Sequence, residues 1–251
     1  MIDPPVANLA DPAFWEEEYL GEVPLPVRPD RSIAFERCLT NALERHAPVT
    51  NGQRVLEVGC APAKWLVFYA ERFGADVEGV EYTGRGASLS RMNLELTRVR
   101  GKIHHSDFFR IEPSRFDLVL SLGFIEHFDD IEAAFARHVE FVAPSGRLVI
   151  GVPNYRGLNR WLQRLSDVDH LAMHNARAME PQLYYQLAAR NGLQLSYADH
   201  IGGFDPIIIK LGRRRALPFV LLAGRYRRLR IADRINHPLA SSYLLVVMQR
   251  T

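Results

Sequence analysis

Three acidic residues stand where short apolar runs end, at positions that could serve the binding of one ligand. Glu57 lies inside RVLEVG just before Gly59, Glu81 ends DVEGVE, and Asp107 follows KIHHS. A carboxylate offers only hydrogen-bond acceptors, so it suits the hydroxyl and amino groups of a ligand. Because ligands bind at the carboxyl edge of an open α/β sheet, we expect these acids to face one site. The alternative is that each acid caps a neighbouring helix.

The turn after Gly59 has the form of a ligand-binding loop between a strand and a helix. Free N–H groups at the start of such a helix point at the ligand, and the small Ala61 and Ala63 allow close approach. Pro62 suits the entrance to a helix. A dinucleotide fold would have G-x-G-x-x-G, but Ala61 and Lys64 occupy its second and third glycine positions. A lysine obstructs close packing of helix on strand, so the pattern disfavours a pyrophosphate.

A second group of residues has the chemistry of a general base. His127 follows an apolar run, and Asp169, His170 and His174 lie in the polar stretch DVDHLAMHN. Histidine titrates near neutral pH, which suits the activation of a hydroxyl nucleophile. The alternatives are a solvated loop with ordinary histidines, or a hard-cation site formed by Glu126 with Asp169 or His170.

Alternating apolar runs and helical periods predict how these residues are positioned. The pattern is typical of an α/β protein with a doubly wound, mostly parallel seven-stranded sheet. The expected strands are Val55–Gly59, Asp76–Glu81, Lys102–Phe108, Phe116–Gly123, Arg147–Pro153, Leu193–Gly203 and Ser241–Arg250. The expected helices are Pro12–Leu20, Ile33–Ala47 with Ser32 as its cap, Ala63–Phe73, Gly86–Arg100, Ile131–Val142, Leu158–Leu165 and Pro181–Arg190.

Five segments resemble landmarks of the class I S-adenosylmethionine-dependent methyltransferases, in particular the ubiquinone-type group. The resemblance covers residues 54 to 154 and implies a Rossmann-like methyltransferase fold with S-adenosylmethionine as methyl donor. Two departures are Ala61 and Ala63, which replace glycines of the family's loop. The segments are EVGCAPA (57–63), Glu81 with Tyr82, Asp107 with Phe108, SLGFIEHF (121–128) and GRLVIGVPN (146–154).

The resemblance also implies roles for the residues at the donor. Glu81 would accept hydrogen bonds from both ribose hydroxyls, and Asp107 one from the adenine amino group. Tyr82 or Phe108 would lie against the adenine ring. The residues assigned to the methionine end are Glu57, Gly59, Ala61, Ser121 and Gly123.

The expected reaction is O-methylation of a small or carbohydrate-like acceptor, because the loop from Asp167 to Asn175 is polar. No metal is expected, since the sulfonium already activates the methyl group and Gly123 replaces a carboxylate that helps to bind metal in the ubiquinone-type group. The alternatives are N-methylation, a nicotinamide-dependent oxidoreductase and a donor-binding protein without catalysis.

Composition limits the partners and the compartment. The formal net charge of the 251 residues is +2, which argues against a nucleic-acid partner, and Cys38 and Cys60 lack the spacing of a metal site. No signal peptide or membrane span is recognised, so a reducing cytoplasm is expected.

The domain organisation follows from the same pattern. Residues 1–48 are expected to form an arm with helices that could act as a lid, and 49–251 the donor-binding domain with insertions at 154–178 and 205–238. The sequence 210–230 is basic and without acids. It would contact an anionic surface, form a solvent-exposed helical insertion between the last two strands, or form an oligomer contact.

Overall fold

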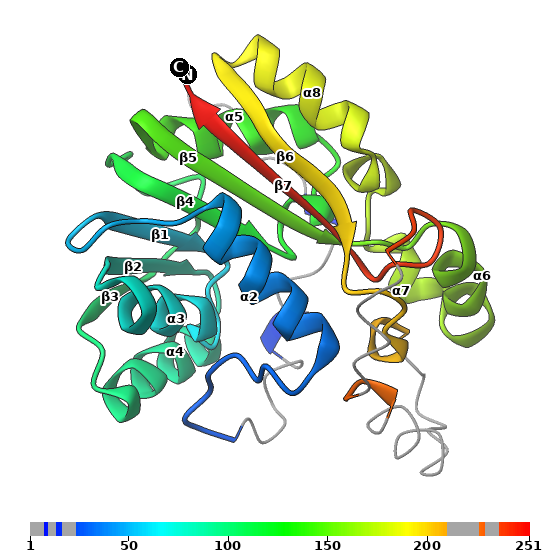
Figure 1. Ribbon diagram of the computed structural model, residues 1–251, viewed down its shortest axis with the longest axis horizontal. Helices are drawn as coiled ribbons and strands as arrows, with labels where there is room; N and C mark the ends of the chain where they lie inside the picture. The colour runs from blue at the N-terminus through cyan, green and yellow to red at the C-terminus, as the bar shows by residue number, and fades with distance from the viewer. Residues whose placement is uncertain (1–7, 10–13, 17–23, 210–225, 229–235) are drawn as a thin grey trace.

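A seven-stranded sheet forms the centre of the molecule, with helices on both of its faces (Figure 1). The computed structural model describes residues 8–9, 14–16, 24–209, 226–228 and 236–251. The strand order is β3-β2-β1-β4-β5-β7-β6, and only β7 runs antiparallel to its neighbours. The predicted fold class is therefore confirmed.

The bounds of most elements agree with the prediction to within a few residues. The strands are β1 (Arg54–Val58), β2 (Asp76–Glu81), β3 (Gly101–His105), β4 (Phe116–Leu122), β5 (Val142–Pro153), β6 (Leu193–Ile201) and β7 (Tyr243–Arg250). The helices are α2 (Ala34–His46), α3 (Lys64–Phe73), α4 (Gly84–Thr97), α5 (Ile131–Phe141), α6 (Gly157–Ser166), α7 (Val168–Ala172) and α8 (Pro181–Arg190), with 3₁₀ turns η1 (Ile125–His127), η2 (Ala176–Met179) and η3 (Pro206–Ile208).

Two helix starts differ from the prediction for local reasons. α4 begins at Gly84 because the Thr83 hydroxyl accepts a hydrogen bond from the backbone N–H of Gly86. Ser32 was the wrong cap for α2, whose N-cap is Ile33 and has no side-chain hydrogen bond.

Each face of the sheet has its own hydrophobic core. On one face, α2, α3 and α4 cover residues that include Val55 and Leu118. On the other, α5 and α8 cover residues that include Leu56 and Val119. Successive side chains of a strand point to opposite faces, so a central strand needs apolar residues throughout. This explains the near-continuous apolar runs of the sequence.

The N-terminal residues that the structure describes lie across the carboxyl edge of the sheet. Asn8 forms a β-bridge with Phe128, and the backbone N–H of Leu9 donates to the carbonyl of His127 at 2.7 Å. Residues 14–16 are helical, while the rest of the predicted helix at 12–20 lies outside the described residues. Trp15 packs edge-on against the His127 ring, with ring centroids 4.9 Å apart.

The stretch after β5 is more helical than the predicted loop. Asp167 accepts a hydrogen bond from the backbone N–H of His170 and so caps α7. Asn175 caps η2 in the same way. In Figure 1, α6 and α7 lie beyond the carboxyl end of β5. Of the basic segment 210–230, only 226–228 are described, and there Arg227 pairs with Asp205 at 2.9 Å.

Within the described residues, no helix is both long enough and apolar enough to cross a membrane.

Candidate active site

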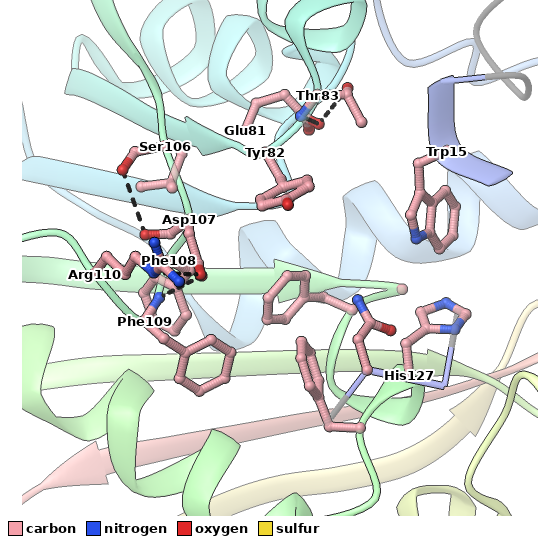
Figure 2. Close-up of a pocket in the computed structure, with 16 residues that line it drawn as sticks. Trp15, Glu81, Tyr82, Thr83, Ser106, Asp107, Phe108, Phe109, Arg110 and His127 are labelled. Carbon is pink, nitrogen blue, oxygen red and sulfur yellow. Dashed lines mark hydrogen bonds and ion pairs between the residues drawn. The ribbon is translucent and has the colours of Figure 1, made fainter. Parts of the chain in front are cut away.

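A cavity of about 280 Å³ opens at the carboxyl ends of β1, β2 and β4, and we call it the donor cavity (Figure 2). Glu81, Tyr82 and Asp107 line it from one side, and Trp15 and His127 close its other end. The sequence placed these acids at one sheet edge, and the structure does bring Glu81 and Asp107 to one cavity.

The Glu81 carboxylate is held by the backbone around it. Its Oε1 accepts hydrogen bonds from the backbone N–H and the hydroxyl of Thr83, at 2.9 and 2.7 Å. Its Oε2 accepts a longer one, 3.3 Å, from the backbone N–H of Ala61. A Cβ on Gly86 would lie 2.9 Å from the Glu81 carboxyl carbon, so glycine is needed there for α4 to come this close. The carboxylate is therefore fixed before any ligand binds.

The far end of the donor cavity is built by the loop after β3. Asp107 Oδ1 accepts a hydrogen bond from the backbone N–H of Phe109 at 2.9 Å, and Arg110 Nε lies 3.5 Å from Oδ2. Both rings line the cavity, but Phe108 is only 3% exposed and packs against the rings of His138 and Phe141, whereas Tyr82 is 53% exposed. Tyr82 is thus the better placed of the two rings to lie against a flat ligand.

The turn after β1 adopts a backbone that requires its glycine. Gly59 has φ of +69°, in the left-handed region, and a Cβ there would lie 3.1 Å from the Phe124 ring. Ala63 has a similar φ of 65° where the family's loop has a glycine. The close approach of Phe124 was not predicted from the sequence.

Three of the five residues assigned to the methionine end do not line the cavity. Gly59 and Gly123 do, but among the described lining residues Glu57, Ala61 and Ser121 are absent. Glu57 and Ser121 are buried. Burial raises the pKa of Glu57 well above its usual value, although a hydrogen bond from the Leu66 backbone opposes this. Glu57 therefore lies beneath the start of α3 and not at the ligand surface.

A second cavity of about 320 Å³ adjoins the first, and we call it the acceptor cavity. The two cavities share Trp15, Gly123 and His127. Aromatic and polar side chains both line the acceptor cavity. The aromatic residues are Phe14, Trp15, Phe35, Trp65, Tyr155 and Tyr243, and the polar residues are Lys64, Glu126, His127, His170 and His174.

The tautomer of His127 follows from its hydrogen bond. Its Nδ1 lies 2.8 Å from the carbonyl of Met173, which can only accept, so Nδ1 carries the proton. Burial lowers the pKa of His127 to about 4, below the near-neutral value expected from the sequence. At neutral pH its Nε2 therefore bears a lone pair.

Glu126 and His127 do not form an ion pair at neutral pH, although Glu126 Oε1 lies 3.7 Å from His127 Nε2. Burial raises the pKa of Glu126 to about 8, so its carboxyl is mainly protonated while the imidazole is neutral. His127 in the shared wall and Glu126 in the acceptor cavity beside it are thus polar but mainly uncharged at neutral pH.

The other base candidates differ in their suitability. His174 Nδ1 donates to the carbonyl of His170 at 2.7 Å, and its ring centroid lies 4.7 Å from that of His127. Tyr155 donates its hydroxyl proton to the Ile208 carbonyl, so His170 Nε2 must donate to the Tyr155 oxygen. Asp169 is exposed and, in the described part of the chain, lines neither cavity. The structure thus brings His174 next to His127. His170 Nε2 is already used in the hydrogen bond to Tyr155, and Asp169 lies outside both cavities among the described residues.

The structure groups Glu126 with other partners than the cation site considered from the sequence. Ligand atoms of Glu126, His127 and His174 all lie within 4.8 Å of one another, whereas the sequence paired Glu126 with Asp169 or His170. Both histidines use Nδ1 for a backbone carbonyl, an arrangement that often orients metal-binding histidines. These three side chains could hold a divalent cation.

Comparison with known proteins assigns this chain to a protein family. The model of a methyltransferase-domain family matches residues 31–196. The chain belongs to this family. The predicted family is thereby confirmed.

The curated relatives resemble the central part of this methyltransferase-domain chain. A ubiquinone biosynthesis O-methyltransferase of Rhodopseudomonas palustris is 30% identical over 132 residues, 51% of this chain and 52% of the relative. A phosphoethanolamine N-methyltransferase 2 of Caenorhabditis elegans is 27% identical over 111 residues, 43% of this chain and 25% of the relative. The chain thus spans about half or less of the length of the relatives it matches.

Solved structures show the same fold. A phosphoethanolamine N-methyltransferase 2 of Haemonchus contortus, in complex with S-adenosylhomocysteine, has a TM-score of 0.59 at 17% identity, covering 84% of this chain and 52% of that one. The [4+2]-cyclase SpnF also has a TM-score of 0.59, at 13% identity, covering 84% and 80%. These likenesses concern the fold alone.

Proposed function

We propose that this protein transfers a methyl group from S-adenosylmethionine to a hydroxyl of a small acceptor. The observation that supports this best is that His127 stands at the wall shared by the donor and acceptor cavities. Its Nε2 is unprotonated at neutral pH, so a proton acceptor lies where the two ligands would meet.

On the donor side, the fixed Glu81 carboxylate would accept hydrogen bonds from the two ribose hydroxyls. Asp107, at the opposite end of the cavity from His127 (Figure 2), would accept one from the adenine amino group, with the exposed Tyr82 ring against the base. This orientation would direct the sulfonium and its methyl group toward Gly59, Gly123 and the acceptor cavity.

The transfer itself is a single displacement. The acceptor oxygen attacks the methyl carbon, the bond between that carbon and sulfur breaks with its electrons left on sulfur, and the hydroxyl proton passes to His127 Nε2. His174 would assist from its neighbouring position. Trp15 packs against the His127 ring and would help to exclude water from it.

The lining of the acceptor cavity limits the acceptor's chemistry. Aromatic walls suit the flat face of a ring. The neutral His127 and the protonated Glu126 suit a neutral hydroxyl better than an anion, and the one cation among the described lining residues, Lys64, is paired with Glu36. A hydroxylated ring, either aromatic or a sugar, fits both conditions. N-methylation is the second candidate, because an amine acceptor would need no base and one curated relative is an N-methyltransferase.

Labelled S-adenosylmethionine with a panel of phenols, sugars and amines tests this function. We expect label in ethers, and loss of that product in His127→Ala with donor affinity kept. Label in amines alone, undiminished in His127→Ala, would contradict the proposal. Donor binding without transfer to any compound would favour a non-catalytic or different role, as the shared fold of a cyclase illustrates.

A further inference from the structure

Helix α6 presents its apolar side chains to solvent. Leu158, Trp161 and Leu165 are 45, 60 and 70% exposed, and Val168 at the start of α7 is 58% exposed. The first three recur at a spacing of three and four residues, so they form one stripe along the helix. A surface helix normally turns such a stripe toward the core.

Buried hydrogen bonds fix α6 in this orientation. Asn159 and Gln163 are both fully buried. The Asn159 amide donates to the carbonyls of Asn154 and Ser241 at 2.9 and 3.0 Å, and the Gln163 amide donates to that of Asp167 at 2.9 Å. Rotating the helix to bury its leucines would break the hydrogen bond from Asn159 to the distant Ser241 carbonyl, so the exposed stripe is a built feature of the fold.

The stripe continues onto the neighbouring chain segment. Leu239 is 51% exposed, and its carbonyl accepts a hydrogen bond from the backbone N–H of Leu158 at 2.9 Å. We call the resulting surface the α6 patch, defined by Leu158, Trp161, Leu165, Val168 and Leu239.

The charges beside the α6 patch are mainly positive. Helix α6 has no acidic residue, and its Arg160 and Arg164 are exposed with no ion pair recorded among the described residues. Asp167 is turned inward to cap α7, which leaves Asp169 as the exposed acid of that short helix.

The exposed apolar side chains and the neighbouring arginines together indicate what binds to the α6 patch. A second copy of the chain would bring two basic surfaces together, which is unfavourable. A bilayer with anionic headgroups accepts arginines at its phosphates and leucine and tryptophan side chains just below them. We propose that the α6 patch docks the protein on the surface of an anionic phospholipid bilayer.

Docking here would bring the active site to the membrane. Arg160, Arg164 and Val168 line a further cavity of about 320 Å³, and this cavity shares Tyr155 and His174 with the acceptor cavity. A lipid-dissolved acceptor would have a short path from the bilayer surface to His174. The docking itself does not depend on the proposed reaction.

Co-sedimentation of the full chain with vesicles tests the proposal. We compare phosphatidylcholine vesicles with vesicles that also contain phosphatidylglycerol, at low and high salt. The wild type is expected to sediment with the anionic vesicles and to be released by salt. The double variants Leu158→Ser/Leu165→Ser and Arg160→Gln/Arg164→Gln should each lose affinity about tenfold or more.

The matched control is Leu96→Ser, because Leu96 is a 52% exposed leucine on α4, away from the α6 patch (Figure 1). It should bind vesicles like the wild type, and all variants should keep the wild-type melting temperature. A wild type that stays in the supernatant would overturn the proposal, as would patch variants that sediment normally. Wild-type dimers that Leu165→Ser dissociates, without vesicle binding, would assign the patch to self-association instead.

Discussion

The Nδ1 atom of His127 donates a hydrogen bond to the Met173 carbonyl at 2.8 Å. Met173 follows α7, so the stretch after β5 fixes the tautomer of a side chain that follows β4. Because of this contact, Nε2 carries the lone pair. His127 can therefore act as a base at the wall between the two cavities.

His127→Ala is expected to lower kcat about 100-fold, the usual size of a general-base contribution, with the affinity for the donor product unchanged. His105→Ala, at an exposed histidine at the end of β3, is the control and should leave both quantities unchanged. Rates of labelled methyl transfer and calorimetric donor affinities measure these effects. A wild-type rate of methyl transfer in His127→Ala would show that His127 is not the general base.

Metal removal tests the alternative role of Glu126, His127 and His174. If His127 acts as a base, dialysis against a chelator should leave the transfer rate unchanged. A rate that falls on chelation and returns with one divalent cation would show that the three side chains act as ligands. Metal analysis of the purified protein gives an answer that is independent of the acceptor.

His138 is expected to make the fold sensitive to acid. Its side chain is fully buried, its Nε2 has no hydrogen-bond partner in the described structure, and burial lowers its pKa to about 4. The unfolded chain takes up this proton below its ordinary pKa near 6.5, while the folded chain does not. The contribution of neutral His138 to the free energy of unfolding is therefore fully present above about pH 6.5. It is lost as the pH falls toward 4, and the loss is roughly 3 kcal/mol.

Urea unfolding of His138→Leu at pH 7 and at pH 4 checks this effect. The wild type should lose more stability than the variant between the two values. Equal losses in both proteins would mean that His138 is protonated in the folded state. His127, which has a similarly lowered pKa, remains in both proteins and so cancels in the comparison.

Much of the fold could be predicted because local signals and global packing agree. The bounds of α8 match the prediction, since Pro181 occupies its first turn and Asn191 with Gly192 ends it. β2 ends at Glu81 as expected. Glu57 was misplaced, although strand alternation puts it on the same face as Val55, under the helices and away from the ligand.

The acceptor side could not be predicted because its contacts join distant segments. Trp15 comes from an irregular arm, and no local pattern indicates that it packs on His127. His174 approaches Glu126 because the backbone N–H of Asn175 donates to the Glu126 carbonyl at 2.7 Å. Such long-range hydrogen bonds leave no periodicity in the sequence.

The most direct test of the account is calorimetric titration of the folded protein with S-adenosylhomocysteine. The wild type should bind one equivalent, and Glu81→Gln should lose affinity roughly 30-fold, because an amide replaces the carboxylate that accepts from the ribose hydroxyls. Glu95→Gln, at an exposed position of α4, should bind like the wild type. Absence of heat with folded wild-type protein, or equal affinities of Glu81→Gln and wild type, would contradict the donor site.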